Sequence, residues 1–479
     1  MIVNLHNIRT LCIQLLIGLL LLASCVKFPK IPDPVDYEFT EYLYPFNEEV
    51  TDVNTVITIE TKGGLNPNYI SAEIPFLKYN KSWLFTLTQD DCKHHAYSWT
   101  WAAINGYPLS NQYFYNFKNL WAGDLPPDHY YLGKTLGSTD GTGNEVRFTY
   151  TTTLSPQEKW MDDKTVVHGS NINRFIMKSG LVWDNVREIL NYGNSIAFHD
   201  VVTDASNTDS IFVNLIKVQD IILDKLKGRG TKVLAEPNGN KKYIDAALMF
   251  PEIRVMTAQN GQVYEIFPYT QNDNLDRVLI KRVIYNNGYE YQMTNDVVDN
   301  LAKPVENRKA INIGVHGVDN TWLSNLVWLN DEYGKDGDDS MWFTSLEEYF
   351  EYNHYRQNSV INLKVEATRI TISLNLPMGK FFYFPSITLN IRGLTLNDVA
   401  SLNVDEQVQG LSYANYRNNQ GETMLMINLD CRKYLVQHAT HFVERYEKHG
   451  SEPFKKDALY FTGKLKDSQT KQALMQRLN

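Results

Sequence analysis

Two adjacent carboxylates follow an apolar stretch near residue 90. Residues 83–88 are mostly apolar or β-branched, which predicts a buried strand, and Asp90 and Asp91 come shortly after it. Two acids at the end of a buried strand are costly unless a cation or a hydrogen-bond network holds them. Carboxylates bind divalent metal ions and also act as general bases, so the pair could do either chemistry. Asp90 could instead cap the helical segment predicted after it.

Histidines supply the second kind of reactive side chain. His199 and His316 each follow a short apolar stretch, and His94 and His95 come just after the acid pair. Imidazole binds metals and exchanges protons near neutral pH. Each histidine also has a structural alternative. His199 could be a hydrogen-bonded interior residue, His316 an ordinary strand-end residue, and His94 and His95 surface or loop residues.

Alternating strands and helices are expected to position these side chains. After the strand at 83–88, the apolar periodicity predicts strands at 195–198, 231–235, 252–257 and 311–315, and helices at 183–190, 209–228, 243–249, 322–333 and 344–355. This repeated order predicts an α/β fold with a parallel sheet closed or nearly closed into a barrel. The carboxyl ends of parallel strands share one rim, so the pattern places together Asp90, Asp91, His199, Asn238 and His316.

The pattern also predicts how the chain divides. The barrel is expected to span residues 81–357, with a polar insertion near 109–174 that would form a lid or binding surface and contains one strand-like run at 146–153. Residues 26–80 are predicted to form a proline-containing tether and a small N-terminal β-module. Residues 358–479 show period-two alternation and then mixed segments, which predicts an antiparallel, sandwich-like β-domain with a helical tail.

The first residues resemble a bacterial lipoprotein signal. Arg9 precedes an apolar run at 11–23, too short for a membrane span, and the run leads into Leu22-Ala23-Ser24-Cys25. By this resemblance residues 1–25 are a signal peptide, and Cys25 is the lipidated first residue of the mature chain. The protein would then be lipid-anchored to the bacterial cell envelope, at the outer membrane, in the periplasm or at the cell surface. A plain signal peptide with an incidental cysteine is the alternative.

Composition excludes some partners. The net charge of −9 argues against a nucleic-acid partner, which would need a basic face. Aromatic residues make up 12% of the chain, and such side chains suit either stacking on sugar rings or the core of an ordinary β-domain.

Several segments, in order, resemble the polysaccharide deacetylase family (NodB-homology domains, carbohydrate esterase family four). Phe85-Thr-Leu-Thr-Gln-Asp-Asp91 resembles the family's Thr-Phe-Asp-Asp motif. The run from Gly193 to His199 is similar to Gly-His-Glu-Ile-Gly-Asn-His at its first, fourth and last positions. Pro237-Asn238-Gly239 resembles the Arg-Pro-Pro-Tyr-Gly segment, and Val315-His316 resembles the late Leu-His motif. The resemblance spans about residues 81–355 and implies a deformed barrel of the polysaccharide-deacetylase type.

The resemblance also implies an activity. The family hydrolyses N- or O-acetyl groups on sugars with a divalent metal, zinc in the first place or another divalent ion. By this resemblance Asp90 is the general base, Asp91 and His199 are metal ligands, and His316 is the general acid. The partner would be a polysaccharide or oligosaccharide.

The sequence departs from the family at two positions. The second histidine of the metal motif is replaced by Thr203, and the arginine of the third motif is replaced by Ala235. Further candidates for metal ligation or substrate binding are Asp200, Thr203, Asp204, Glu236, Asn238, His94 and His95. An oxygen ligand in place of histidine would favour a harder metal than zinc.

Two other functions therefore stay open. A catalytically impaired, carbohydrate-binding surface lipoprotein on the same fold would explain the two departures. A glycosidase with paired carboxylates would need a second acid on another strand, for which Glu236 is the candidate.

Overall fold

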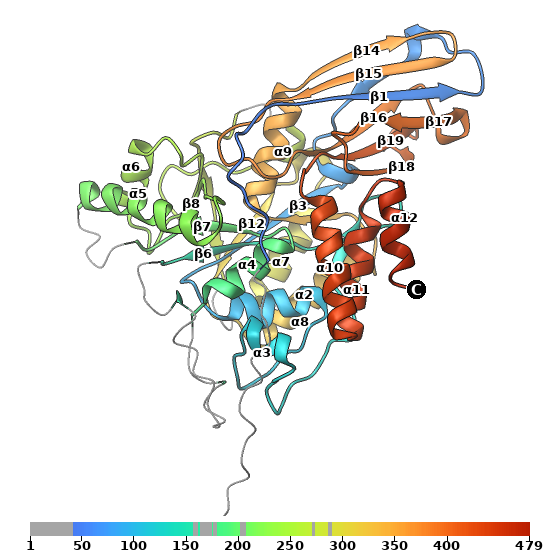
Figure 1. The fold of residues 1–479 in the computed structure, drawn as a ribbon. Helices are drawn as coiled ribbons and strands as arrows, with labels where there is room; N and C mark the ends of the chain where they lie inside the picture. The colour runs from blue at the N-terminus through green and yellow to red at the C-terminus, as the bar shows by residue number, and fades with distance from the viewer. Residues whose placement is uncertain are drawn as a thin grey trace, which may run out of the picture.

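A computed structural model describes residues 42–156, 161–162, 175, 180–201, 207–270, 274–285 and 290–479. Figure 1 shows an α/β barrel at the left and centre, with two antiparallel sheets projecting at the upper right. Three C-terminal helices stand beside the barrel at the lower right. The expected fold class, a deformed α/β barrel with an antiparallel β-domain, is confirmed.

Nine strands form the barrel sheet, and all their pairings are parallel. In hydrogen-bonding order they are β10 (Leu279–Lys281), β9 (Val255–Ala258), β8 (Val233–Ala235), β7 (Ser195–Phe198), β6 (Thr151–Leu154), β3 (Trp83–Gln89), β12 (Ile311–Val315) and β11 (Val283–Ile284), with β13 (Met341–Thr344) also paired to β3. Only Arg282 separates β10 from β11, and these two strands pair with opposite ends of the sheet. The sheet therefore closes into a barrel at Arg282.

Burial on both faces explains the composition of the strands. All seven residues of β3 are buried, as expected for a parallel strand with the barrel interior on one face and helices on the other. β6 is also a barrel strand, between β3 and β7, so residues 151–153 of the strand-like run at 146–153 belong to the barrel sheet and not to an insertion. Its three threonines are β-branched, which suits a strand, and they are fully buried; Thr151 Oγ1 lies 2.8 Å from Ser195 Oγ on β7. A hydroxyl that is satisfied by a neighbouring strand can occupy a buried β position.

Helices cover the outside of the barrel. Those that follow the predicted pattern are α4 (Trp183–Asn191), α5 (Thr208–Lys225), α6 (Lys241–Met249), α8 (Asn320–Tyr333) and α9 (Leu346–Asn358). The helical segment predicted after the acid pair is a π-helical stretch (Ala96–Trp101) that continues into α2 (Ala102–Asn105), and the structure adds α3 (Phe117–Ala122) and α7 (Glu290–Leu301). Capping side chains set several helix starts; at α5 the Asn207 side chain accepts hydrogen bonds from the Asp209 and Ser210 amides.

The β-domain consists of two four-stranded antiparallel sheets. One contains β14 (Val360–Val365), β15 (Arg369–Leu376), β1 (Val53–Thr61) and β17 (Val399–Val404); the other contains β18 (Gly410–Arg417), β19 (Thr423–Asp430), β16 (Ser386–Arg392) and β2 (Ser71–Glu73). The strands expected to form a separate N-terminal module instead complete these C-terminal sheets. Ile57 and Ile59 of β1 share one apolar core with Ile387 and Leu389 of β16, because an isolated strand pair could not bury them.

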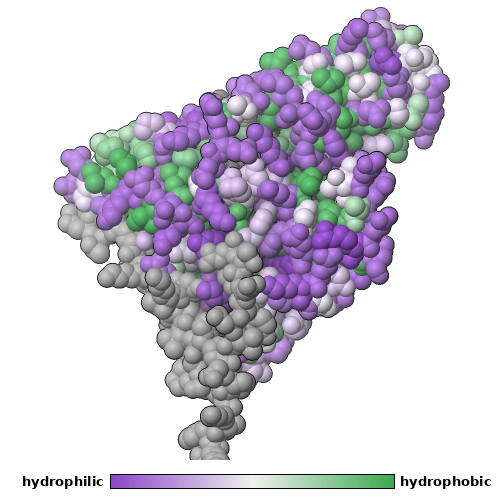
Figure 2. All heavy atoms as spheres, viewed as in Figure 1, coloured by the Kyte–Doolittle hydropathy of each residue, from purple (hydrophilic) through white to green (hydrophobic). Residues whose placement is uncertain are grey.

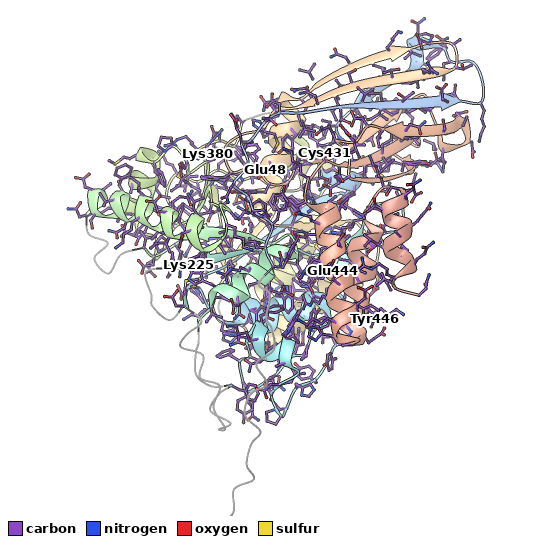
Figure 3. All side chains as sticks on the ribbon, in the orientation of Figure 1. Glu48, Lys225, Lys380, Cys431, Glu444 and Tyr446 are labelled. Carbon is purple, nitrogen blue, oxygen red and sulfur yellow. The ribbon has the colours of Figure 1, made fainter. Side chains whose placement is uncertain are left out.

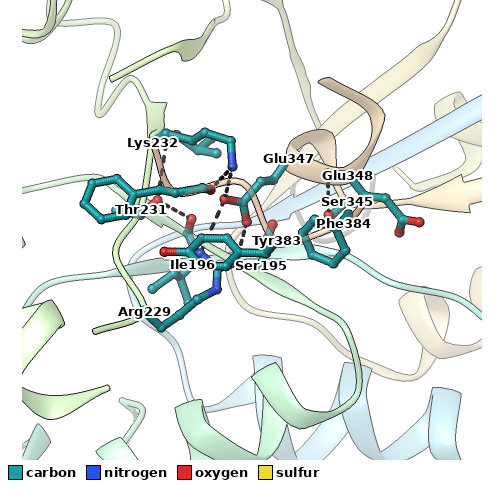
Figure 4. Close-up of polar contacts among 12 residues, drawn as sticks. Ser195, Ile196, Arg229, Thr231, Lys232, Ser345, Glu347, Glu348, Tyr383 and Phe384 are labelled. Atoms are coloured by element: carbon teal, nitrogen blue, oxygen red, sulfur yellow. Dashed lines mark hydrogen bonds and ion pairs between the residues drawn. The ribbon is translucent and has the colours of Figure 1, made fainter. Parts of the chain in front are cut away.

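A buried charge network joins the barrel to the β-domain (Figure 4). Lys232, just before β8, lies 2.7 Å from Glu347 and 2.6 Å from Glu351 on α9, and all three side chains are fully buried. Arg229 adds a second ion pair to Glu347 at 2.6 Å. Glu351 also accepts hydrogen bonds from the backbone amides of the loop before β16. The network fixes α9 between the two parts of the molecule.

The C-terminal helices are α10 (Leu435–His449), α11 (Glu452–Gly463) and α12 (Gln469–Gln476), and they pack on the barrel. On α10, Arg445 is fully buried and lies 2.6 Å from Glu188 on α4. Its neighbour Glu444 points to the exterior (Figure 3). On α11, Asp457 forms a buried ion pair with Arg147 at 2.5 Å. The helical tail is therefore an integral layer of the fold.

The visible face of the molecule is mainly hydrophilic, with apolar side chains scattered over it (Figure 2). Within the part of the chain that the structure describes, no helix is long and apolar enough to cross a membrane. The predicted signal peptide, tether and lipidated Cys25 lie outside the described residues.

Replacing Arg445 by alanine is expected to lower the free energy of unfolding by about 3–5 kcal/mol, because Glu188 would be left buried without its partner. Urea denaturation monitored by circular dichroism measures this loss. Glu444→Ala, one residue away on the exposed face, is the matched control and should change stability by less than about 0.5 kcal/mol. Equal, small losses in both variants would contradict a stabilising role for the buried pair.

Candidate functional site

The two acids after β3 point in different directions because the chain turns sharply there. Asp91 and Cys92 have φ angles of 61° and 50°, in the left-handed region that non-glycine residues rarely adopt. Asp90 is buried, whereas the Asp91 side chain is 41% exposed. Such backbone conformations cost of order 1–3 kcal/mol each and cluster at functional sites. The turn therefore gives the two carboxylates separate surroundings.

Asp90 is held by a buried arginine from the closure of the barrel. Arg282 Nη1 donates to Asp90 Oδ1 at 2.8 Å, and Nη2 donates to the backbone carbonyl of Glu236 at 3.1 Å. Arg282 is fully buried and the Asp90 side chain is 2% exposed. The absence of a side chain at Gly314 on β12 leaves space for Arg282. A Cβ at this position would lie 3.2 Å from Arg282 Cδ and 2.3 Å from Ile284 Cδ1.

Asp91 faces His199 across the rim. His199 Nδ1 lies 2.9 Å from the carbonyl oxygen of Ala235, which can only accept, so Nδ1 carries a proton. In the neutral ring Nε2 is then an acceptor, yet it lies 3.3 Å from Asp91 Oδ1, which is another acceptor. A proton or a metal ion must lie between these two atoms for the contact to be favourable.

The electrostatics agree with this contact. The hydrogen bond with His199 has the largest effect on Asp91. Together with the charges of His199, His316 and Lys93, it lowers the pKa of the carboxyl to about 2 against partial burial. For His199, burial is the largest single effect, and it disfavours the charged ring. The charge of Asp90 and the hydrogen bond with Asp91 outweigh burial and raise its pKa.

His316 belongs to the same rim. Its charge acts on Asp91, its ring is half-buried, and its backbone carbonyl accepts from Gln89 Nε2 at 3.4 Å. His95 lies beside the next residue, since a Cβ on Gly317 would be 3.8 Å from His95 Cε1. Burial lowers the pKa of His95 to about 4, with a smaller effect from Lys93, so its ring is neutral at physiological pH.

His94 faces the interior instead. Its Nδ1 lies 3.1 Å from Ser98 Oγ, and its Nε2 lies 3.3 Å from Asn185 Nδ2. Burial, with a smaller effect from His95, lowers its pKa to about 3. Both ring nitrogens therefore already have partners, and His94 acts as a structural residue.

The remaining candidates lie near the rim in different roles. Asp200 Oδ1 accepts from the Tyr243 hydroxyl at 2.6 Å. The Glu236 carboxylate is buried, with Oε1 2.8 Å from Lys241 Nζ; this is an ion-pair distance without hydrogen-bond geometry. Asn238 is exposed in a turn, with φ 53°. Thr203 and Asp204 lie outside the described residues.

The donor set fits part of a metal site. Asp91 and His199 converge, and the facing acceptor atoms suit a cation. Among the residues with described positions, no group of three or more His, Cys, Asp and Glu side chains is arranged to hold a metal ion. The chain thus shows two converging protein donors at this rim.

A scan against family models identifies the family to which this fold and site belong. The model described as "Putative polysaccharide deacetylase" matches residues 55–479. The chain belongs to the polysaccharide deacetylase family. The match covers the barrel, the β-domain and the C-terminal helices, and it confirms the resemblance inferred from the motifs. A search of curated proteins finds no match. Membership of this family indicates a hydrolase-like protein whose general function concerns polysaccharides.

Sequence reasoning missed Arg282, the residue that holds Asp90 in this deacetylase-family chain. The arginine expected in the third motif is Ala235, at the end of β8, and the guanidinium comes instead from the junction of β10 and β11. The basic pair Lys281-Arg282, flanked on both sides by two apolar residues of the segment Leu279 to Ile284, is the signal that could have drawn attention to it.

In the metal-free protein, His199 should titrate with a pKa above its ordinary value of about 6.5. The stabilisation from protonated His199 is then fully present below about pH 6.5 and is lost as pH rises through the raised pKa. Asp91→Asn should lower this pKa, because it removes the hydrogen-bonding charge. NMR titration of the His199 Cε1 proton measures both values.

The matched control for this titration is Asp200→Asn, which is next to His199 in sequence but faces Tyr243. It should shift the titration much less than Asp91→Asn. A His199 pKa below 6.5 in the metal-free wild-type protein would contradict the Asp91 contact.

Proposed function

We propose that this protein is a divalent-metal-dependent hydrolase that removes acetyl groups from a polysaccharide. The observation that carries the proposal is the pair of facing acceptors, His199 Nε2 and Asp91 Oδ1, beside a carboxylate held by a buried arginine. This arrangement calls for a cation next to a potential base, and the family match supplies the class of reaction and substrate.

Asp91 and His199 would hold the metal, zinc or another divalent ion. When bound, such an ion lowers the pKa of water and polarises an acetyl carbonyl. The hydrogen bond from His199 Nδ1 to the Ala235 carbonyl fixes the ring with Nε2 toward Asp91 Oδ1, as second partners of metal-binding histidines commonly do. Deprotonated Asp91 supplies the negative charge that an ion needs.

Asp90 would act as the general base. Arg282 fixes the orientation of its carboxylate, which accepts a proton from the attacking water. His316, on the neighbouring strand end, would donate a proton to the amine or alcohol that leaves. Asp90 gains one proton and His316 loses one, so each returns to its starting state by exchange with solvent.

The location of the protein belongs to the same proposal. A lipid on Cys25 would anchor it to the bacterial cell envelope, where envelope or imported polysaccharides are found. Leu22-Ala23-Ser24-Cys25 supports this anchor. The membrane contact would be through the lipid alone.

A catalytically impaired, carbohydrate-binding lipoprotein is the second candidate. The observation in its favour is that only two protein donors converge among the described side chains. The buried Asp90–Arg282 pair favours the enzyme, since a binding protein has no need of an oriented base.

Acetate release from acetylated chitin and xylan oligosaccharides, together with metal analysis of the purified protein, tests the proposal. Asp90→Asn should lower kcat by about 10²–10⁴-fold and keep the metal, because it removes the base and leaves both donors. His199→Ala should lose the metal. Asp200→Asn is the control and should stay within about twofold of wild type. Unchanged acetate release in Asp90→Asn would exclude the proposed mechanism.

Replacing Arg282 by methionine should lower kcat by about tenfold or more and change KM little, because Asp90 loses the group that orients it as a base. Arg282→Lys should restore part of kcat, because it keeps a charge but not the two-pronged geometry. Arg254→Gln, which breaks an ion pair with Asp276 away from the rim, is the control. An unchanged kcat in Arg282→Met would contradict the positioning role.

A further inference from the structure

A cavity of about 760 Å³ lies at the end of the barrel opposite the candidate site. Its wall includes Lys81 and Ser82, which precede β3, and Ser340, which precedes β13. Asp90 and Asp91 follow the other end of β3. Seven residues of strand span roughly 23 Å, so the cavity and the acid pair are separate places on the molecule.

The cavity lies between the barrel and the β-domain. The β-domain contributes Glu73 on β2, Asn390 and Arg392 on β16, and Tyr416 on β18. A cavity between two domains is a common location for ligand sites, and this volume is in the usual range of about 300–1,000 Å³.

Aromatic rings line part of the wall. The ring centroids of Phe76 and Tyr269 lie 5.5 Å apart, and the Arg356 guanidinium lies 4.9 Å from the Phe76 ring. Tyr269 donates its hydroxyl to the Lys81 carbonyl at 2.6 Å, which fixes its ring. Tyr416 is near enough to Tyr269 to influence its ionisation, and each of the three aromatic side chains is half-buried. Rings with both an apolar face and a polar edge suit sugar rings, which have apolar C–H faces and hydroxyl edges.

The charges of the wall balance. Four carboxylates and four cationic side chains line the cavity, so their formal sum is zero. Two pairs are in direct contact: Lys81 with Asp339 at 2.6 Å and Arg392 with Glu73 at 3.2 Å. Amide side chains at positions 418–420 add both donors and acceptors. A wall of this kind favours a neutral ligand rich in hydroxyl groups over a charged one.

The backbone of the wall is held in an unusual conformation. Tyr79 and Asn80, two consecutive lining residues, have φ angles of 61° and 56°. The Tyr79 amide donates to Thr388 Oγ1 at 2.7 Å, and the Asn80 and Asn390 side-chain amides bond to each other at 2.7 and 2.9 Å. Left-handed non-glycine residues that the surroundings hold in place are a feature of binding sites.

We propose that this cavity is a second binding site, for a neutral oligosaccharide segment, with Tyr416 and Tyr269 as its aromatic faces. The site would hold a part of the glycan remote from the acetyl group at the Asp90 rim. Assigning that glycan to the same substrate rests on the proposed function. The binding itself does not.

Isothermal titration calorimetry on the full chain carrying Asp90→Asn, which should not turn over its ligands, tests the proposal. The neutral probes are N-acetylated chitopentaose, cellopentaose and xylopentaose; the charged probes are deacetylated chitopentaose and a galacturonic acid pentamer. At least one neutral probe should bind more tightly than both charged ones. No binding of any neutral probe at 10 mM, or preference for a charged probe, would overturn it.

Adding Tyr416→Ala should weaken binding of the neutral probe about tenfold or more, which corresponds to about 1.4 kcal/mol. Tyr413→Ala is the matched control, because it removes the same side chain from the same strand, but Tyr413 is on the opposite face of β18 and does not line the cavity. Equal affinities in the two variants would place the bound sugar elsewhere and overturn the proposal.

Failure of this proposal can be told apart from failure of the proposed function. In an otherwise wild-type chain, Tyr416→Ala should leave acetate release from di-N-acetylchitobiose unchanged and reduce release from the polymer. If Asp90→Asn leaves acetate release unchanged while Tyr416→Ala still weakens binding, the proposed reaction is wrong and the second site stands. If Asp90→Asn abolishes release and Tyr416→Ala changes neither binding nor release from the polymer, the reaction stands and the second site is wrong.

Discussion

The buried contact between Arg282 and Asp90 links the closure of the barrel to its chemistry. Arg282 is the single residue between β10 and β11, and these strands join the two ends of the sheet. Its guanidinium crosses the interior to Asp90, past a glycine that leaves the necessary room. A buried charge without a partner raises the free energy of the folded state, so each of the two groups offsets the cost of burying the other. The barrel therefore closes in the register that also orients the carboxylate.

The rim combines two different electrostatic environments over two adjacent residues. Asp90 is buried against a permanent cation, and Asp91 is partly exposed against a histidine that can be protonated or bind a metal. Two adjacent carboxylates in one environment would repel each other, and the repulsion would oppose ionisation of both. The left-handed turn at Asp91 separates them, which allows one carboxylate to act as a base while its neighbour binds a cation.

The barrel and the β-domain depend on each other. Lys232, Glu347 and Glu351 form a fully buried network between them, and the strands of the N-terminal segment complete the sheets of the β-domain. The cavity proposed as a second binding site lies between the same two parts. The family match over residues 55–479 agrees with one continuous assembly.

The sequence alone determined the regular part of the fold. β7 and β12 begin and end where the apolar runs predict, and α4 and α5 are within a few residues of their predicted bounds, because local periodicity and caps specify such elements. The parallel rim follows from the order of these elements, and that order predicts that Asp90, Asp91, His199 and His316 lie together.

The tertiary structure decided the rest. The strand-like run at residues 146–153 could not be placed in the barrel, because the strands that β6 pairs with, β3 and β7, are distant from it in the chain. The N-terminal strands could not be assigned to the C-terminal sheets, since their partners are more than 300 residues away in the chain. Arg282 could not be matched to Asp90, because 192 positions separate them and only the closure of the barrel brings them within hydrogen-bonding distance. Local sequence patterns specify elements, whereas contacts between distant residues depend on how those elements pack.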